Sequence, residues 1–301
     1  MMNHKFSNSL RRSALHIPAT NQRAMAKAQS LPADVIIFDF EDAVAPWDKA
    51  LARQTLCEQL ADANYGPREI VLRINGVDSD WYHDDIKYLP ELLAILPPNL
   101  HLSAIAIPKV GTVNDVLAVR HALDTANLEH LSLWPLIETP AGVMNVRAIV
   151  QAHESINCLI VGTSDLTKEL RLVGDDQRLG LLFSLSQCVL AARECGIDIL
   201  DGVCLNLNDQ ALLAQQAEQG KSLGFTGKTV IHPNQLSITN STFGVNPEAL
   251  AEAKDILQAW RKAEQNGEGL AVVNGKLIES LHIEVAQRLV TDHEEIKSRG
   301  F

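Results

Sequence analysis

The sequence predicts a (β/α)8 barrel with a C-terminal helical extension, and two observations lead to this fold class. Short apolar runs recur along the chain, and helix-like stretches separate them. Each run ends in a charged or polar residue, whereas a strand buried on both faces is otherwise apolar. Eight strands alternating with helices are typical of this barrel, whose chemistry lies at the carboxyl ends of its strands.

The predicted elements follow one another without a low-complexity linker. Pro97 and Pro98 end the third helix, because proline lacks an N–H group and restricts the residue before it. Gly196 and Gly224 stand where helix C-caps belong. The strands are expected at Ala14–Pro18, Asp34–Glu41, Glu69–Asn75, Ala104–Val110, Leu131–Glu138, Cys158–Asp165, Asp198–Leu205 and Gly227–Pro233. The helices are expected at 20–32, 48–63, 81–96, 112–127, 141–153, 179–195 and 208–223.

The chain changes character after the eighth strand. Residues 234–246 are rich in loop-forming residues, and Pro247–Glu264 has the pattern of an amphipathic helix. A short hairpin around Asn274-Gly275 and a last helix over 281–297 follow. We therefore expect a catalytic barrel over residues 1–245, beginning with a loose arm over 1–11. Residues 246–301 would form an extension that acts as a lid or as an arm on a neighbouring subunit.

Composition narrows the class of protein. With 301 residues, 46% of them hydrophobic and 21% charged, the chain is typical of a soluble globular protein, and a barrel occupies this length as one domain. Its net charge of −11 argues against nucleic acid as a partner. Five scattered cysteines without a CxxC pair favour the reducing cytoplasm. No run approaches the ~20 apolar residues that a membrane span needs.

Two carboxylates at neighbouring strand ends are candidates for a metal site. Glu138 ends the fifth strand and Asp165 ends the sixth, and adjacent strands lie about 4.8 Å apart. Two protein oxygens completed by water and substrate are the usual way in which Mg²⁺ is held. The alternative is structural, in that Asp165 caps the helix after it and Glu138 pairs with an arginine.

Further polar residues stand at other strand ends. Arg73 can bind a carboxylate or carbonyl oxygen through its planar fork, or it can serve as a buried partner of the acids after the second strand. Those acids are Asp39, Glu41 and Asp42, which repel one another and need a positive group nearby. A solvated acidic loop is the alternative, although the surroundings are too apolar to favour it.

Three weaker signals complete the set. Gly162, Thr163 and Ser164 precede a helix start, where free N–H groups can bind an anion. Lys109 ends the fourth strand and faces either a phosphate or an acid, with a salt bridge at the barrel rim as an equal alternative. His232 is interpreted as structural.

Seven blocks, in the same order, resemble a known family. They are RRSALHIPATNQRAMAKAQSLPADVIIFDFEDAVAP, LRIN, IPKV, LIETPAGV, VGTSDL, DGVCLNLND and GFTGKTVIHPNQ, and together they cover about residues 11–260. The chain is similar to the citrate lyase β-subunit-like, or HpcH/HpaI aldolase, superfamily. Within it, the blocks look closest to the lyases that act on CoA esters.

The resemblance implies roles for individual residues. It implies that Glu138 and Asp165 bind Mg²⁺, that Arg73 contacts the substrate, and that Glu41 and Asp42 support the site. Arg12, Arg23, Lys27 and Lys109 would lie toward CoA. Family members form trimers or hexamers, in which the C-terminal segment of one subunit covers the site of another.

The chain departs from the family pattern in two blocks. Ala19 and Thr20 stand where a glycine is common after the first strand, near the expected seat of CoA. In GKLIESLH, Glu279 replaces an aspartate that acts in the neighbouring site, and no proline follows. Glutamate keeps the carboxyl group but is longer by one methylene, and the step that depends most on this acid is thioester hydrolysis.

These features predict a Mg²⁺-dependent lyase that cleaves a 3-hydroxy-carboxyacyl-CoA by a retro-Claisen reaction. Citramalyl-CoA, giving acetyl-CoA and pyruvate, is the preferred substrate, with malyl-CoA and citryl thioesters as alternatives. Glu279 would protonate the departing enolate, and Glu41 is a candidate base. The rivals are a metal-dependent pyruvate aldolase that uses no CoA and a CoA-binding subunit without activity.

Overall fold

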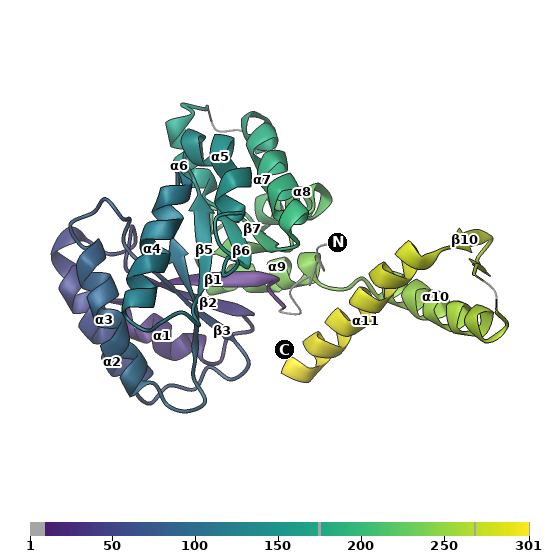
Figure 1. The fold of residues 1–301 in the computed structure, drawn as a ribbon, viewed down its shortest axis with the longest axis horizontal. Coiled ribbons are helices and arrows are strands. Elements are labelled where there is room, and N and C mark those ends of the chain that lie inside the picture. The colour runs from purple at the N-terminus through teal and green to yellow at the C-terminus, as the bar shows by residue number, and fades with distance from the viewer. Residues whose placement is uncertain (1–9, 174–175, 268, 301) are drawn as a thin grey trace. The chain divides into compact units, whose positions relative to one another are not determined.

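In the computed structural model, which describes residues 10–173, 176–267 and 269–300, eight parallel strands close into a barrel in chain order (Figure 1). β1 pairs with both β2 and β8, which closes the ring and confirms the predicted (β/α)8 barrel. All but residues 10 and 11 of the predicted arm lie outside the described residues. The barrel strands are β1 (Ser13–Pro18), β2 (Val35–Asp39), β3 (Glu69–Arg73), β4 (Leu102–Ile107), β5 (Ser132–Ile137), β6 (Cys158–Val161), β7 (Asp198–Asp201) and β8 (Gly227–Val230).

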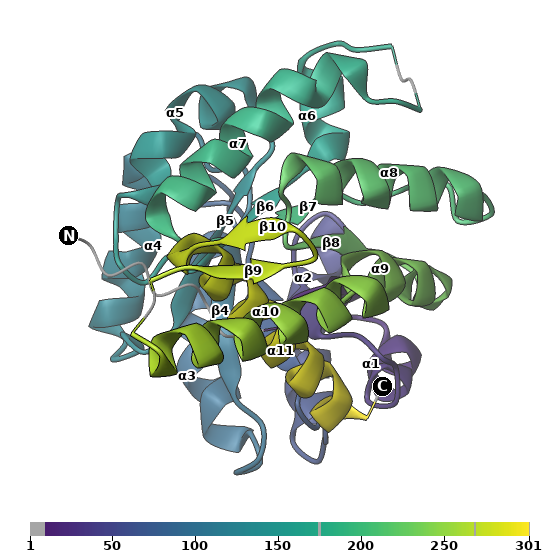
Figure 2. The same cartoon turned by 90° about the vertical axis from the view of Figure 1, so that its right-hand side faces the viewer.

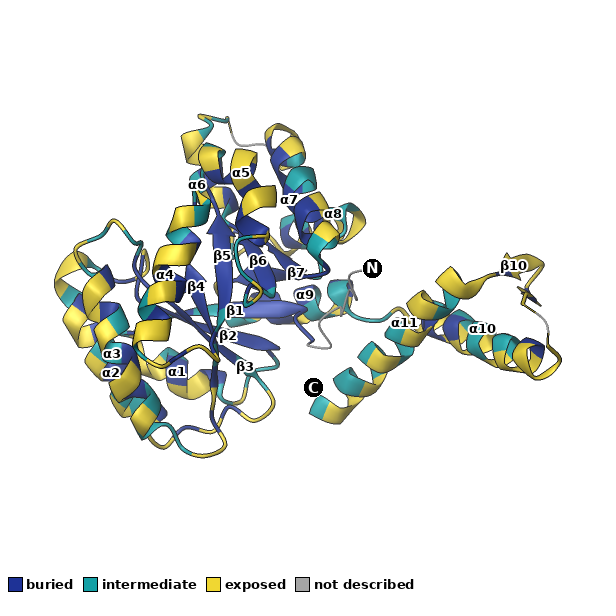
Figure 3. Ribbon diagram, in the orientation of Figure 1, coloured by how far each residue is buried: buried dark blue, intermediate teal, exposed yellow. Residues whose placement is uncertain are grey.

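Helices surround the barrel, and their outer faces are exposed while the strands are buried (Figure 3). Short 3-10 turns occupy Pro46–Asp48, Leu179–Leu181 and Pro233–Gln235. Among the described residues, no helix is both long and apolar enough to cross a membrane. The helices of this part are α1 (Gln22–Ala28), α2 (Lys49–Leu60), α3 (Tyr82–Ile95), α4 (Val113–Thr125), α5 (Pro140–Val150), α6 (Thr163–Glu169), α7 (Leu182–Cys195), α8 (Gln210–Leu223) and α9 (Leu236–Phe243).

The interior of the barrel is apolar below its carboxyl end. Trp134 lies toward the amino end, where the guanidinium of Arg11 stacks 4.7 Å from its ring centroid. Arg11 also bonds Glu69 and Asp198, so ion pairs close this end of the barrel. The buried interior cluster consists of Ala14, Val35, Ile37, Val71, Ala104, Ala106, Trp134, Leu136, Cys158, Ile160 and Leu200.

Two elements differ from the sequence-based expectation. The sixth strand ends at Val161 rather than at Asp165, because the chain turns at Gly162 into α6. Asp165 is therefore a residue of the first turn of a helix rather than the last residue of a strand. The expected loop at 234–246 contains the helix α9. Leu236 and Thr239 of this helix are buried.

The described residues from Phe243 onward form a second compact unit. It contains α10 (Pro247–Gln265), the hairpin strands β9 (Ala271–Val273) and β10 (Lys276–Ile278), and α11 (Ser280–Arg299) (Figure 2). Asn274 and Gly275, with φ of 51° and 77°, form the predicted hairpin turn. Ala263, Val273 and Ile278 are buried together in this unit. Its independence as a domain and its role as a lid or arm remain predictions.

Candidate active site

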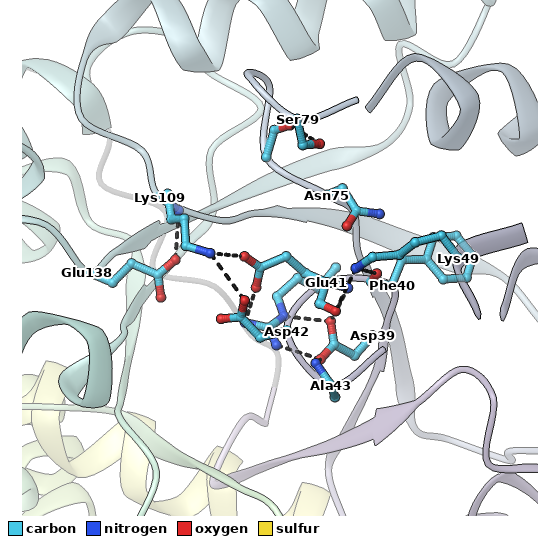
Figure 4. A network of polar contacts seen from close by, with 12 residues as sticks. Asp39, Phe40, Glu41, Asp42, Ala43, Lys49, Asn75, Ser79, Lys109 and Glu138 are labelled. Carbon is cyan, nitrogen blue, oxygen red and sulfur yellow. Dashed lines mark hydrogen bonds and ion pairs between the residues drawn. The ribbon is translucent and has the colours of Figure 1, made fainter. Parts of the chain in front are cut away.

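The structure brings acidic side chains that follow three strands to one end of the barrel, and Figure 4 shows those from the ends of β2 and β5. Asp39 is the last residue of β2, and Glu41 and Asp42 follow it in the loop. Glu138 comes directly after β5, and Asp165 lies in the first turn of α6, after β6. All five acids therefore lie at the carboxyl end, where barrels of this class place their chemistry.

A pocket of about 300 Å³ opens among these groups. Four carboxyl groups and a single arginine line it, so within the described part of the chain the pocket carries an excess of negative charge. Gly162, Thr163 and Ser164, which we predicted to bind substrate, line the same pocket. Leu136 and Ile160 supply apolar surface. The pocket therefore suits a small polar ligand that arrives together with a cation.

Arg73 is held by Asp39 at the end of β2 and by Glu41 in the loop that follows. Its Nε and Nη2 donate to the two carboxylate oxygens of Asp39 at 2.8 and 2.5 Å. Its Nη1 lies 2.9 Å from Glu41 Oε2. Burial alone would raise the pKa of Asp39, but the charge and hydrogen bonds of Arg73 outweigh burial and lower it. Asp39 is thus an ionised partner that holds the guanidinium in one orientation.

Lys109 bridges the acids rather than reaching outward. Its Nζ contacts Glu41 and lies 3.2 Å from Asp42 Oδ1. Its backbone has a φ of 54°, and its N–H donates to Glu138 Oε1 at 2.7 Å. Of the two roles left open for Lys109, the structure favours the salt bridge to an acid, and its contact with CoA remains a prediction. Burial raises the pKa of Glu41 although Arg73 and Lys109 oppose this shift.

Glu138 is packed against the backbone of the next strand end. A Cβ added at Gly162 would lie 2.3 Å from Glu138 Oε2 and 2.5 Å from Glu138 Cβ, so a side chain at position 162 would displace this carboxylate. Among the described residues Glu138 makes no ion pair, although it is 2% exposed. Burial, followed by the charge of Glu41, raises the pKa of Glu138 to about 8, against the opposing effect of Arg73.

These features fit a Mg²⁺ ion at Glu138 and Asp165. A divalent cation would compensate the buried carboxylate, and both acids line the pocket. No group of three or more His, Cys, Asp or Glu side chains close enough to hold a metal occurs among the described residues. That absence is compatible with Mg²⁺, because this ion commonly takes one or two carboxylates and fills its remaining positions with water and substrate oxygens.

The structure does not place Arg12 in the pocket. Arg12 precedes β1 and therefore lies at the amino end of the barrel, where it is 5% exposed. Its Nε and Nη2 donate to both carboxylate oxygens of Asp34 at 2.8 and 2.9 Å. The prediction that Arg12 lies toward CoA is therefore wrong for this geometry, because the sequence block could not show which face of the barrel the side chain takes.

Replacing Arg12 with methionine tests this correction. The variant removes the guanidinium that pairs with the buried carboxylate of Asp34, so we expect a loss of about 3–5 kcal/mol in the free energy of unfolding. The KM of the folded enzyme for a CoA ester should stay unchanged. Chemical denaturation and steady-state kinetics measure the two effects. A raised KM with unchanged stability would return Arg12 to the CoA site.

The other residues predicted from the family pattern occupy the surface. Arg23 and Lys27 are exposed on α1, which begins after the carboxyl end of β1, and their role toward CoA remains a prediction. Glu279 belongs to the second compact unit, where its N–H donates to His282 Nδ1 at 3.0 Å at the start of α11. Its action in a neighbouring site also remains a prediction.

Sequence reasoning missed two residues of the site. Lys49 Nζ donates to the carbonyl oxygens of Phe40 and Glu41 at 2.6 and 2.8 Å and fixes the acidic loop. His16 lines the pocket from β1. The sequence contains a signal for His16. This polar residue stands in an apolar run two positions after Ala14, and alternate residues of a strand share a face, so His16 points inward like Ala14. His232, by contrast, is structural as predicted, because its Nδ1 accepts from the Asn234 N–H.

Comparison with known proteins defines the class to which this fold and site belong. The family model of HpcH/HpaI aldolase/citrate lyase matches residues 12–233, and the chain belongs to this family of enzymes. The chain is 41% identical, over 95% of both sequences, to a (3S)-malyl-CoA thioesterase of Cereibacter sphaeroides. It is 28% identical to the mitochondrial citramalyl-CoA lyase of Homo sapiens, over 96% of this chain and 87% of that one.

A solved structure supports the same relationship. The citrate lyase beta subunit from M. tuberculosis, complexed with oxaloacetate and magnesium, matches with a TM-score of 0.64 and 25% identity. The match covers 80% of this chain and 99% of that one.

Proposed function

We propose that this enzyme is a Mg²⁺-dependent (3S)-malyl-CoA thioesterase. The observation that carries the proposal is the 41% identity, over 95% of both chains, to a relative with that name. The pocket supports it, since it joins a carboxylate pair suited to Mg²⁺ with an arginine suited to a substrate oxygen. The proposal replaces citramalyl-CoA cleavage, the reaction preferred from the sequence, as the first candidate.

Glu138 and Asp165 would hold the metal. The ion, when bound, supplies Lewis-acid polarisation of the substrate oxygens that it contacts. The magnesium in the related citrate lyase beta subunit structure supports this assignment, as does the burial of Glu138, which makes no ion pair with the residues that the structure describes. Gly162 contributes by leaving room for the Glu138 carboxylate.

Arg73 would neutralise negative charge on the thioester oxygen as water adds to the carbonyl carbon. Asp39 fixes the direction of its guanidinium through two hydrogen bonds, so that little reorganisation is needed during the reaction. Thr163 and Ser164 line the pocket and can orient the substrate.

The structure favours Asp42 over Glu41 as the group that accepts the proton from the attacking water. Both oxygens of Glu41 are engaged by cations, one by Lys109 and the other by Arg73, and Glu41 does not line the pocket. Asp42 lines the pocket and is about half exposed. Glu41 then serves to position Arg73 and Lys109, and Glu279 of another chain stays a second candidate for proton transfer.

Retro-Claisen cleavage of citramalyl-CoA is the second candidate function. The identity to the human citramalyl-CoA lyase, over 96% of this chain, favours it. The two reactions share the need for a metal and for Arg73. They differ in the bond that breaks, which is the thioester C–S bond in hydrolysis and a carbon–carbon bond in cleavage.

Product analysis in H₂¹⁸O separates these functions. We would incubate the enzyme and Mg²⁺ with (3S)-malyl-CoA, citramalyl-CoA and citryl-CoA and identify the products by mass spectrometry. Hydrolysis gives free CoA and malate with ¹⁸O in one carboxyl group. Cleavage gives acetyl-CoA with glyoxylate, pyruvate or oxaloacetate, and would overturn the thioesterase proposal. No conversion of any ester would favour the CoA-independent aldolase or the inactive subunit.

Assembly and location complete the proposal. A homotrimer or homohexamer is supported by the apolar side chains of Met144, Phe183 and Leu190, which are exposed on the neighbouring helices α5 and α7. The cytoplasm is supported by the free thiols of all five cysteines.

A further inference from the structure

His16 is a half-buried polar residue on the wall of the pocket. It lies on β1 two residues beyond Ala14, which belongs to the interior cluster, so both side chains point inward. Its Nδ1 is buried without a hydrogen-bond partner. Among the described residues, neither ring nitrogen has a protein partner, and the ring lines the same pocket as Arg73 and Glu138.

This arrangement differs from that of a structural histidine. His153 and His232 each accept a backbone N–H through Nδ1 and so stabilise local turns. His16 makes no such bond, and an apolar side chain would fill the same space without the cost of an unpaired polar group. Burial, helped by the charge of Arg73 and opposed by Asp39, lowers the pKa of His16 to about 4. The ring is therefore neutral at neutral pH.

A neutral imidazole offers one donor and one acceptor, and its surroundings indicate which ligand atoms it can meet. Nδ1 is enclosed, so Nε2 is the ring nitrogen left to face the cavity. Leu136 and Ile160 line the pocket with apolar surface, and the hydroxyl of Thr229 already donates to the Asp201 carbonyl. His16 therefore offers a hydrogen bond to an oxygen that a ligand brings to this part of the wall.

We propose that His16 is a substrate-binding residue whose Nε2–H donates to an oxygen of the small hydroxy-acid half of the substrate. The proposal rests on the proposed function, because it takes the ligand to be a carboxyacyl group next to the metal site. The bond selects ligands with an oxygen at this wall over ligands that carry a methyl group there. His16 is thus a determinant of specificity as well as of affinity.

The test compares His16→Phe and His16→Gln with the parent enzyme by calorimetric titration with (S)-malate, glyoxylate and pyruvate in Mg²⁺. Phenylalanine fills the space without a donor, and we expect it to weaken binding of (S)-malate about tenfold, or about 1.4 kcal/mol. Glutamine keeps an N–H donor and should recover most of the affinity. Melting temperature should stay the same or rise in His16→Phe, whereas a structural role predicts that it falls.

His232→Phe is the matched control, since that histidine lies outside the pocket, and CoA affinity should be unchanged in all variants. Equal affinity of His16→Phe and the parent enzyme for (S)-malate overturns the proposal. So does a parent enzyme that binds none of the three acids. If the acids bind and depend on His16 but malyl-CoA is not hydrolysed, the role of His16 stands and the thioesterase assignment fails.

Discussion

Glu138→Gln is expected to lower Mg²⁺-dependent turnover by about 10³-fold or more. The amide keeps the shape of the side chain but loses the charge that holds a cation, and Lewis-acid stabilisation of a transition state is worth several kcal/mol. The fold should survive, because burial and the charge of the neighbouring Glu41 both disfavour a negative charge on Glu138. The neutral amide of glutamine removes that unfavourable charge. We expect the melting temperature of the metal-free variant to equal or exceed that of the parent enzyme.

Glu169→Gln is the matched control for this variant. Glu169 is exposed at the end of α6, the helix that carries Asp165, and its replacement should change neither turnover nor stability. Steady-state kinetics with and without EDTA give the metal-dependent part of the rate. Retention of full EDTA-sensitive turnover in Glu138→Gln would show that Glu138 is not a metal ligand.

Arg73→Met is expected to remove activity and to destabilise the fold at the same time. Asp39 is fully buried and would lose the cation that keeps it ionised, which costs about 3–5 kcal/mol in the free energy of unfolding. The double variant Arg73→Met/Asp39→Asn should regain most of the stability but none of the turnover. Denaturation and kinetics of the single and double variants separate the two roles. A double variant as unstable as the single one would contradict this account of the pair.

The ion pair between Arg73 and Asp39 also predicts how the stability of the fold depends on pH. Arg73 lowers the pKa of Asp39 in the folded state below its unfolded value of about 4. The stabilisation by the pair is therefore complete above pH ~4 and is lost as the pH falls through the lower folded pKa. The difference in stability between the parent enzyme and Arg73→Met should accordingly shrink in acid. Denaturation curves over this pH range measure it, and a difference that grows in acid would contradict the assignment.

The sequence was sufficient for the strands because each one is an apolar run that ends in a polar residue. It failed at α9, where Ser, Thr and Asn have weak helix propensity and contacts to the barrel decide the structure. There, Asn240 donates to the carbonyl of Pro32 at 2.5 Å, a contact between segments far apart in sequence. It also failed at Asp165, since the run Cys158–Asp165 reads as one strand and Gly162 turns the chain inside it.

Candidate site residues were predictable only where their strand position was clear. Glu138 and Arg73 lie at strand ends, and the geometry of the barrel therefore brings them together. Arg12 stands before its strand, so barrel geometry carries it to the opposite end from the pocket. The partnership of Lys109 with Glu41 and Asp42 depends on side-chain placement, and spacing along the chain leaves that undetermined.

Calorimetric titration of Mg²⁺ into the enzyme, with (S)-malate present, tests the proposed metal site most directly. We predict about one bound Mg²⁺ per chain in the parent enzyme and loss of this binding in both Glu138→Gln and Asp165→Asn. Parent-like Mg²⁺ affinity in either variant would contradict the proposal that these two carboxylates hold the metal.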